Sequence, residues 1–114
     1  MEITVERPLG KIVLIRLAGV YDISEIFRFE TAVTENTDSD TRVLALDFSE
    51  LVFIDSSAIS SLIRMKNKVS KDGIQVLIID IQDDILNMFK LAYLDRFFTL
   101  IPRADFLKYV DEER

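Results

Sequence analysis

The sequence predicts an α/β domain in which a small mixed β-sheet carries its helices mainly on one face. Two observations lead to this prediction. Apolar stretches typical of β-strands alternate with amphipathic stretches of helical period, and helices between successive strands favour parallel pairing with right-handed crossovers. With 114 residues, 49% of them hydrophobic, the chain is long enough for one core. We therefore expect a single domain over residues 1–114.

Five runs rich in Val, Ile, Leu or Phe are predicted as strands. The first two are joined by Arg7-Pro8-Leu9-Gly10, a connection whose Pro and Gly favour an antiparallel hairpin. The predicted strands are residues 3–6, 11–18, 42–48, 74–81 and 97–101.

Four segments with apolar residues at helical spacing are predicted as helices, which gives the order ββαβαβαβα. Gly73 follows the second of them and is predicted to be its left-handed C-terminal residue. Six aromatic residues are predicted to pack in the core because of their spacing. The helical positions are Ile26, Phe29, Ala32 and Val33, then Ile59, Leu62, Ile63 and Val69, then Ile85, Phe89 and Ala92, then Phe106, Leu107 and Val110. The aromatic residues are Phe27, Phe29, Phe89, Tyr93, Phe97 and Phe98.

The composition excludes several kinds of chemistry. The chain has no Cys, His or Trp, which removes thiolate and imidazole nucleophiles, histidine bases and every Cys or His metal site. It has 3 glycines and no glycine-rich phosphate loop. We therefore predict that the protein is not an enzyme and needs no metal or cofactor. Its net charge of −6 disfavours nucleic acid and anionic membranes as partners.

Localisation and assembly are predicted from apolar patterning. The longest apolar run, residues 12–20, is interrupted by Arg16 and is too short to span a bilayer. The first residues have neither the basic nor the hydrophobic region of a secretion signal. We expect a cytoplasmic protein, and a monomer, because an acidic surface with few apolar patches disfavours association.

The most informative stretch is residues 46–59, which lead from a predicted buried strand into the second helix. Asp55, Ser56 and Ser57 are all residue types that cap helix N-termini, and capping alone is a sufficient explanation for them. On a helical wheel, however, Ser57 and three later residues share one face opposite the apolar residues, so that Ser57 is predicted to face outward. The later residues are Ser61, Arg64 and Lys68.

A phosphate on such a serine is compatible with the fold. The free amides and partial positive charge of a helix N-terminus stabilise a nearby phosphate by about 0.3 to 1 kcal/mol. The same group adds about −1.5 to −2 charge, and burying that charge unpaired in an interface costs several kcal/mol. Ser57 is therefore suited to a switch that changes binding and leaves the fold intact. Lys66, near the middle of the apolar face, is predicted to extend its ammonium group outward.

Three segments of the chain together resemble the STAS domain of bacterial anti-sigma factor antagonists. The first is Leu44 to Ile59, with the sequence Asp55-Ser56-Ser57 before the helix. The second is Gly19-Val20-Tyr21-Asp22, which is similar to the Gly-x-x-Asp turn of the family. The third is Phe89 to Phe98, which is similar to its helix before the last strand. The likeness covers nearly the whole chain in the family's order.

The resemblance implies a partner-switching module. In that family the second serine, here Ser57, is phosphorylated by a serine kinase that is also an anti-sigma factor and brings the ATP and Mg²⁺. The unphosphorylated domain binds the kinase and releases its target; phosphorylation abolishes binding, and a PP2C-type phosphatase reverses it. Ser56 is the alternative acceptor. The implied partner interface is Asp22, Asp55, Ser56, Ala58, Ser61 and Arg64. The family usually has Gly where this chain has Ala58.

Two alternatives stay open at this point. The domain could be a STAS scaffold or regulator in a stressosome-like complex or a complex without a sigma factor, with Ser57 as a packing residue or a rarely used acceptor. Alternatively, Asp47 and Asp80 end two predicted parallel strands and, with Asp22 or Asp55, could bind Mg²⁺ as in an enzyme or a phosphoaspartate receiver. The second alternative is weaker, because the first strand is not followed by adjacent acids and the last is not followed by lysine.

Overall fold

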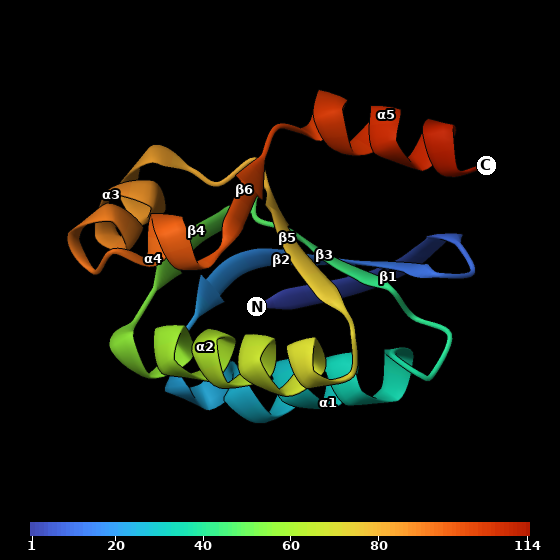
Figure 1. Cartoon of the computed structure of the whole chain (residues 1–114). Helices are drawn as coiled ribbons and strands as arrows, with labels where there is room; N and C mark the ends of the chain where they lie inside the picture. Colours follow the sequence, from blue (N-terminus) through green and yellow to red (C-terminus); the bar gives the residue numbers. More distant parts are fainter.

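The computed structural model describes residues 1–114 and shows one mixed six-stranded sheet with a helical layer on each face (Figure 1). The strands lie in the order β1-β2-β3-β5-β6, and β4 pairs with β2 outside this path. Their bounds are β1 Glu2–Leu9, β2 Ile12–Tyr21, β3 Val43–Asp47, β4 Leu51–Ile54, β5 Gln75–Ile79 and β6 Thr99–Ile101. The predicted α/β class and its mixed sheet are confirmed.

The long strand β2 organises the sheet. It pairs antiparallel with β1, as the predicted hairpin requires, and parallel with both β3 and β4. Residues Ile12 to Arg16 pair with β3, whereas Gly19 to Tyr21 pair with β4. Gly19 has φ 103° where the β2–β4 register shifts, a conformation that glycine adopts without strain. Strand β4 therefore brings the start of the second helix next to the end of β2.

The helices are divided unequally between the two faces of the sheet. Helices α1 and α2 lie side by side below the sheet, whereas α5 lies across the opposite face (Figure 1). The prediction of helices mainly on one face is confirmed. The helical bounds are η1 Ile23–Glu25, α1 Ile26–Asn36, α2 Ser56–Lys71, α3 Asp83–Leu91, α4 Leu94–Phe97 and α5 Arg103–Glu113. Gly73 has φ 79° just after α2, as predicted.

Two hydrophobic cores of different size follow from this arrangement. The larger has 22 buried residues and includes Val13 and Ile15 of β2, whereas the smaller has 8 and includes the alternate residues Ile12 and Leu14. Successive side chains of a strand point to opposite faces, so a strand that is covered on both faces has apolar residues at successive positions, as at Ile12 to Ile15. Phe106 and Val110 of α5 complete the smaller core.

Three short elements are absent from the sequence prediction. Strand β4 has 4 residues and lies between the predicted third strand and the second helix, helix η1 has 3 residues just before α1, and helix α4 has 4 residues and ends at the start of the predicted last strand. Elements this short contain too few positions for a period to be recognised.

The prediction that all six aromatic residues are core residues is wrong for Phe27 and Tyr93, which are 80% and 73% exposed. Tyr93 forms the α3–α4 turn with φ 60°.

Strand β1 is one edge of the sheet. Its residues Glu2, Thr4 and Glu6 are exposed, whereas the alternate residues Ile3 and Val5 are half-buried against the larger core. The β1–β2 register shifts between Glu6 and Leu9, beside Pro8. Charges, proline and an irregular register are the usual protections of an exposed edge strand.

Candidate phosphorylation and docking site

The N-terminus of α2 is capped by an aspartate. One carboxylate oxygen of Asp55, Oδ1, accepts a hydrogen bond from the Ala58 amide at 2.8 Å, and Oδ2 accepts one from the Ile23 amide at 3.2 Å. The predicted capping role of this segment is confirmed, and Asp55 performs it rather than Ser56 or Ser57. Both serine hydroxyls are therefore free of the capping role.

A second aspartate shapes the segment beside α2. Asp22 is the N-cap of η1, and its Oδ1 accepts hydrogen bonds from the Ser24 amide at 3.0 Å and the Ser24 hydroxyl at 2.6 Å. These two bonds to Ser24 lower the pKa of Asp22, which remains ionised at neutral pH. Asp22 and Asp55 thus lie in adjoining segments, because Asp55 bonds to the residue that follows Asp22.

The predicted interface residues of α2 divide into accessible and buried ones. Ser56 and Arg64 are exposed and Ser57 is half-buried, whereas Ala58 and Ser61 have no exposed surface. Of the predicted interface residues in α2, Ala58 and Ser61 therefore have no exposed surface in the structure, and their role in partner binding stays a prediction. A helical wheel considers only the hydrophobicity of each residue, and it therefore places polar Ser61 on the outer face of α2. In the structure, Ser61 instead faces α1 and the end of β2.

Ser61 is the centre of a chain of hydrogen bonds across three elements. The Tyr21 hydroxyl of β2 donates to Ser61 Oγ at 2.9 Å, and the Ser61 hydroxyl donates to Glu30 Oε2 of α1 at 2.9 Å. Burial raises the pKa of Tyr21 to about 12, against a smaller opposing effect of its bond to Ser61. Tyr21 therefore stays protonated and a donor at neutral pH. This chain of hydrogen bonds fixes α1 against α2 at a position one helical turn after Ser57.

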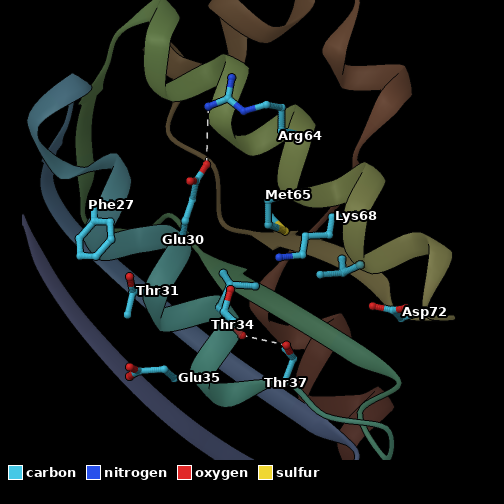
Figure 2. A pocket seen from close by; sticks show the side chains of 12 residues that line it. Phe27, Glu30, Thr31, Thr34, Glu35, Thr37, Arg64, Met65, Lys68 and Asp72 are labelled. Carbon is cyan, nitrogen blue, oxygen red and sulfur yellow. Dashed lines mark hydrogen bonds and ion pairs between the residues drawn. The ribbon is translucent and has the colours of Figure 1, made fainter.

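A groove runs between α1 and α2 (Figure 2). Glu30 and Glu35 lie on its α1 side, whereas Arg64 and Lys68 lie on its α2 side, with Asp72 at the far end of that helix. Arg64 Nη2 lies 3.6 Å from Glu30 Oε2, the same oxygen that accepts the bond from Ser61. Arg64 and Lys68, which the sequence places on the same helix face as Ser57, therefore border α1 directly.

Exposed apolar residues gather around the start of α2. Five of the eight large hydrophobic side chains exposed on the molecule belong to the ends of β2 and β4 and to η1 and α1. We call them the apolar rim: Val20, Ile23, Phe27, Val52 and Phe53. Their exposed fractions range from 40% to 80%. Clustered exposed apolar surface marks interaction sites more often than isolated exposed residues do.

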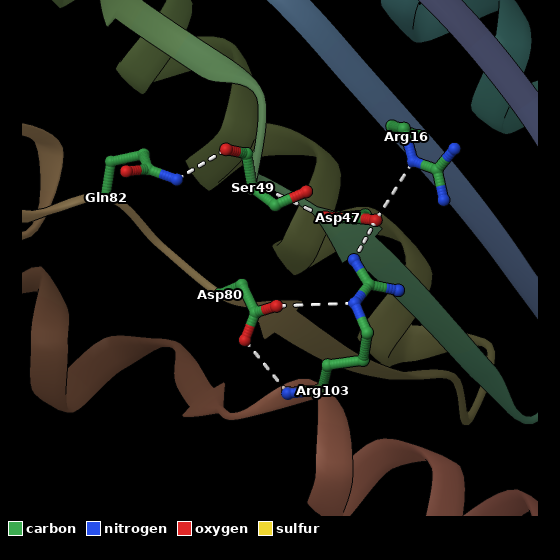
Figure 3. A network of polar contacts seen from close by, with 6 residues as sticks. All are labelled: Arg16, Asp47, Ser49, Asp80, Gln82 and Arg103. Atoms are coloured by element: carbon green, nitrogen blue, oxygen red, sulfur yellow. Dashed lines mark hydrogen bonds and ion pairs between the residues drawn. The ribbon is translucent and has the colours of Figure 1, made fainter.

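A separate polar network holds α5 to the sheet (Figure 3). The fully buried carboxylate of Asp47 is paired with Arg16 Nε at 3.1 Å and with Arg103, and it also accepts from the Ser49 amide at 2.9 Å. Arg103 in turn pairs with Asp80 Oδ2 at 3.3 Å. Burial alone would raise the pKa of Asp47, but the bonds from Arg103, Ser49 and Arg16 together lower it to about 2.

This network contradicts the magnesium alternative. Asp47 and Asp80 are committed to arginines, while Asp22 and Asp55 cap η1 and α2, and no group of three or more acids forms a potential metal site. Sequence reasoning missed Arg103 altogether. The one signal available was Arg16, a charge inside an otherwise apolar strand, which is a pattern that favours a buried ionic partner.

Lys66 lies on the packed side of α2, as predicted. Its ammonium nitrogen is 4.2 Å from the centroid of the Phe97 ring in α4, a cation–π contact worth about 0.5 to 1 kcal/mol at an accessible site. Helix α2 thus contacts α1 along one flank and α4 along the other.

The family model described as the STAS domain matches residues 3–106, and the chain belongs to this family. The predicted resemblance is confirmed. No helix has both the length and the apolar character needed to cross a membrane. Among curated proteins, none matches this sequence.

Solved structures with the same fold come from several kinds of protein. The anti-sigma factor antagonist SpoIIAA in its unphosphorylated form is 14% identical, with a TM-score of 0.80 over 97% of each chain. An anti-sigma factor antagonist from Mycobacterium paratuberculosis is 21% identical, with a TM-score of 0.80 over 96% of this chain and 93% of that one. The murine anion transporter Slc26a9 is 18% identical, with a TM-score of 0.75 over 91% of this chain and 18% of the transporter.

Proposed function

We propose that the protein is a phosphorylation-controlled binding module of the anti-sigma factor antagonist type. In its unphosphorylated form it binds a serine kinase that is also an anti-sigma factor, and this binding releases the kinase's target. Phosphorylation of Ser57 abolishes the binding, and a PP2C-type phosphatase restores it. The kinase supplies ATP and Mg²⁺, and the cytoplasm is the compartment in which such partners meet.

The observation that carries this proposal is the position of Ser57. It lies in the first turn of α2, accessible, without a capping role, and next to the apolar rim. A partner that covers both the apolar rim and the first turn of α2 would contact Ser57. A likeness to SpoIIAA supports the proposal, because that protein has been solved in both an unphosphorylated and a phosphorylated form.

The chemistry requires little from this chain. The Ser57 oxygen bonds to the γ-phosphorus of ATP, the bond to the bridging oxygen of ADP breaks, and the hydroxyl proton passes to a base on the kinase. The product carries about −1.5 to −2 charge at an interface that already contains Asp22 and Asp55. Unless the partner offers a cation there, burying that charge costs several kcal/mol. An affinity loss of about 10² to 10³ follows.

The first experiment is tandem mass spectrometry on the protein isolated from its native cells. The tryptic fragment Val43 to Arg64 contains five serines, so fragmentation has to assign the phosphate to one of them. We expect phosphate on Ser57 in an amount that changes with growth condition. Phosphate on Ser56 instead would move the acceptor by one residue, and a fragment that stays unmodified under stress and in stationary phase would contradict the proposal.

Binding by variants provides the second test. With the kinase that co-purifies with Ser57→Ala, we expect Ser57→Asp to lose binding by at least about tenfold, which calorimetry can measure. Ser60→Asp is the matched control, because Ser60 is exposed on α2 one turn from Ser56 and adds the same charge. Equal binding by Ser57→Asp and Ser57→Ala would favour the scaffold alternative.

A further inference from the structure

One ion pair beside the phosphoacceptor is loosely held. Arg64 and Glu30 are 3.6 Å apart, longer than the 2.7 to 2.9 Å typical of charge-assisted hydrogen bonds. Their side chains are 61% and 43% exposed. Glu30 Oε2 already accepts the Ser61 hydroxyl at 2.9 Å, so Glu30 keeps a partner without Arg64. Arg64 is therefore a cation that can leave its present partner at little cost.

The position of Arg64 on α2 places it on the same side as Ser57. Arg64 follows Ser57 by seven residues, which is about 20° short of two full helical turns. The two Cα atoms are therefore on the same side of the helix and about 10.5 Å apart along its axis. Helical side chains lean toward the N-terminus, which directs Arg64 toward Ser57. Its guanidinium already reaches Glu30, which in turn bonds to Ser61, one turn of about 5.4 Å from Ser57.

The other charged groups near Ser57 are acidic or already paired. Asp22 and Asp55 are the caps described above, and Glu25 of η1 is paired with Arg28 at 2.6 Å. Lys68 lies on the same side of α2 but one turn farther from Ser57. Among the cations facing this end of the groove, Arg64 is the one that is both within reach and weakly engaged.

We propose that Arg64 is the internal counter-charge of phosphorylated Ser57: on phosphorylation its guanidinium leaves Glu30 and binds the phosphate, while Glu30 stays with Ser61. Guanidinium groups bind phosphate in a two-pronged geometry that an ammonium group does not reproduce. The exchange changes two features of the docking face at once, because the phosphate appears and Arg64 ceases to be available to a partner. This proposed role of Arg64 rests on the proposed function only in taking Ser57 as the residue that is phosphorylated.

The test uses the full chain with phosphoserine installed at position 57 during translation, so that neither the kinase nor native phosphorylation is needed. Phosphorus NMR then follows the second ionisation of the phosphate between about pH 4.5 and 8. We expect Arg64→Gln to raise this pKa by at least about 0.5 unit, because the dianion loses its cation. Lys68→Gln is the matched control, since it removes the same charge from the same groove one turn away, and its effect should be less than half as large.

Two further measurements test whether Arg64 moves from Glu30 to the phosphate. In the unsubstituted chain the NMR signal of the Arg64 side-chain N–H should shift on phosphorylation, and Glu30→Gln should lower the pKa of the phosphate by removing its competitor and a nearby negative charge. Equal effects of Arg64→Gln and Lys68→Gln, or an unmoved Arg64 signal, would overturn the proposal. Mass spectrometry that finds no phosphate in cells would instead contradict the proposed function and leave this result standing.

Discussion

At the scale of single residues, Asp55 connects the two segments on which the site depends. One of its oxygens caps α2 and the other holds the first amide of η1. A carboxylate that accepts amide hydrogen bonds at a helix N-terminus satisfies donors that would otherwise have no partner in the helix. Asp55 therefore sets the distance between Ser57 and the part of the apolar rim that η1 carries.

We expect Asp55→Ala to reduce the free energy of unfolding by about 1 to 2 kcal/mol, because a helix cap is lost. Urea denaturation measures this change. The control is Asp40→Ala, the same replacement at an exposed loop position, which should stay within about 0.5 kcal/mol of the parent. If the two variants unfold at the same urea concentration, the double role of Asp55 in stability is refuted.

At the scale of elements, helix α5 is tied to the sheet by its first residue. Arg103 opens the helix and pairs with the buried Asp47 at the end of β3 and with Asp80 after β5. Asp47 also bonds to the Ser49 amide, at the start of the loop that leads into β4. The attachment of α5 is thus continuous, through Asp47, with the segment that leads to Ser57.

The pKa of Asp47 predicts a pH dependence of stability. Its folded-state pKa of about 2 is below the ordinary 3.8, so the charged carboxylate stabilises the fold fully above about pH 4 and this contribution is lost as the pH falls toward 2. We expect the stability advantage of the parent over Asp47→Asn to shrink by about 2 kcal/mol across that interval. Unfolding curves measured at several pH values check this.

The variant Arg16→Gln distinguishes the contribution of the Asp47 ion pairs from that of other groups that become protonated in acid. Arg16→Gln removes one of the two guanidinium partners of Asp47 and should therefore reduce the slope of stability against pH between about pH 4 and 2. Parallel pH profiles for the parent, Asp47→Asn and Arg16→Gln would show that Asp47 is not the group responsible.

Much of the fold could be predicted at this scale, since long elements have a recognisable period. Strand β2 is apolar at nearly all of its ten positions, with Arg16 as its one charged residue, and α2 is amphipathic over 16, so the sequence predicts both. The four-residue β4 is not predicted, because its formation depends on pairing with β2, which is distant in the sequence. Likewise the capping by Asp55 is a local pattern, whereas the Arg103–Asp47 pair joins residues 56 positions apart and has no local signal.

The orientation of Ser61 shows a second limit of sequence reasoning. Hydrophobicity assigned this serine to the outer face, yet the structure buries it, because Tyr21 and Glu30 supply partners for its hydroxyl. A polar residue is buried at low cost only where such partners exist. Those partners come from β2 and α1, so the inward direction of Ser61 is a property of the assembled domain.

At the scale of the whole molecule, the two faces of the sheet are stabilised unequally. The α1–α2 side is covered by a core of 22 buried residues, and the α5 side by a core of 8. Helix α5 is further held by the Arg103 pairs at its start and by the Lys11–Glu113 pair, 3.1 Å, near its end. Partial opening of a domain begins where the fewest apolar contacts have to be broken.

We therefore expect native-state hydrogen exchange to detect a partial opening in which α5 detaches and the rest stays folded. Amides of α5 should exchange with a smaller free energy and a weaker dependence on denaturant than amides of β3 and of residues 76–79 of β5, which are buried on both faces. Exchange of α5 amides only through global unfolding, with the same denaturant dependence as β3, would contradict this expectation.

The exposed strand β1 affects whether copies of the molecule associate edge to edge at high concentration. If two β1 strands paired antiparallel about Thr4, Glu2 of one copy would lie opposite Glu6 of the other, and this would happen twice. Like charges directly opposite each other in a sheet are unfavourable. The two glutamates therefore disfavour edge-to-edge growth into fibrous aggregates along β1, which is the longer of the two edge strands of the sheet.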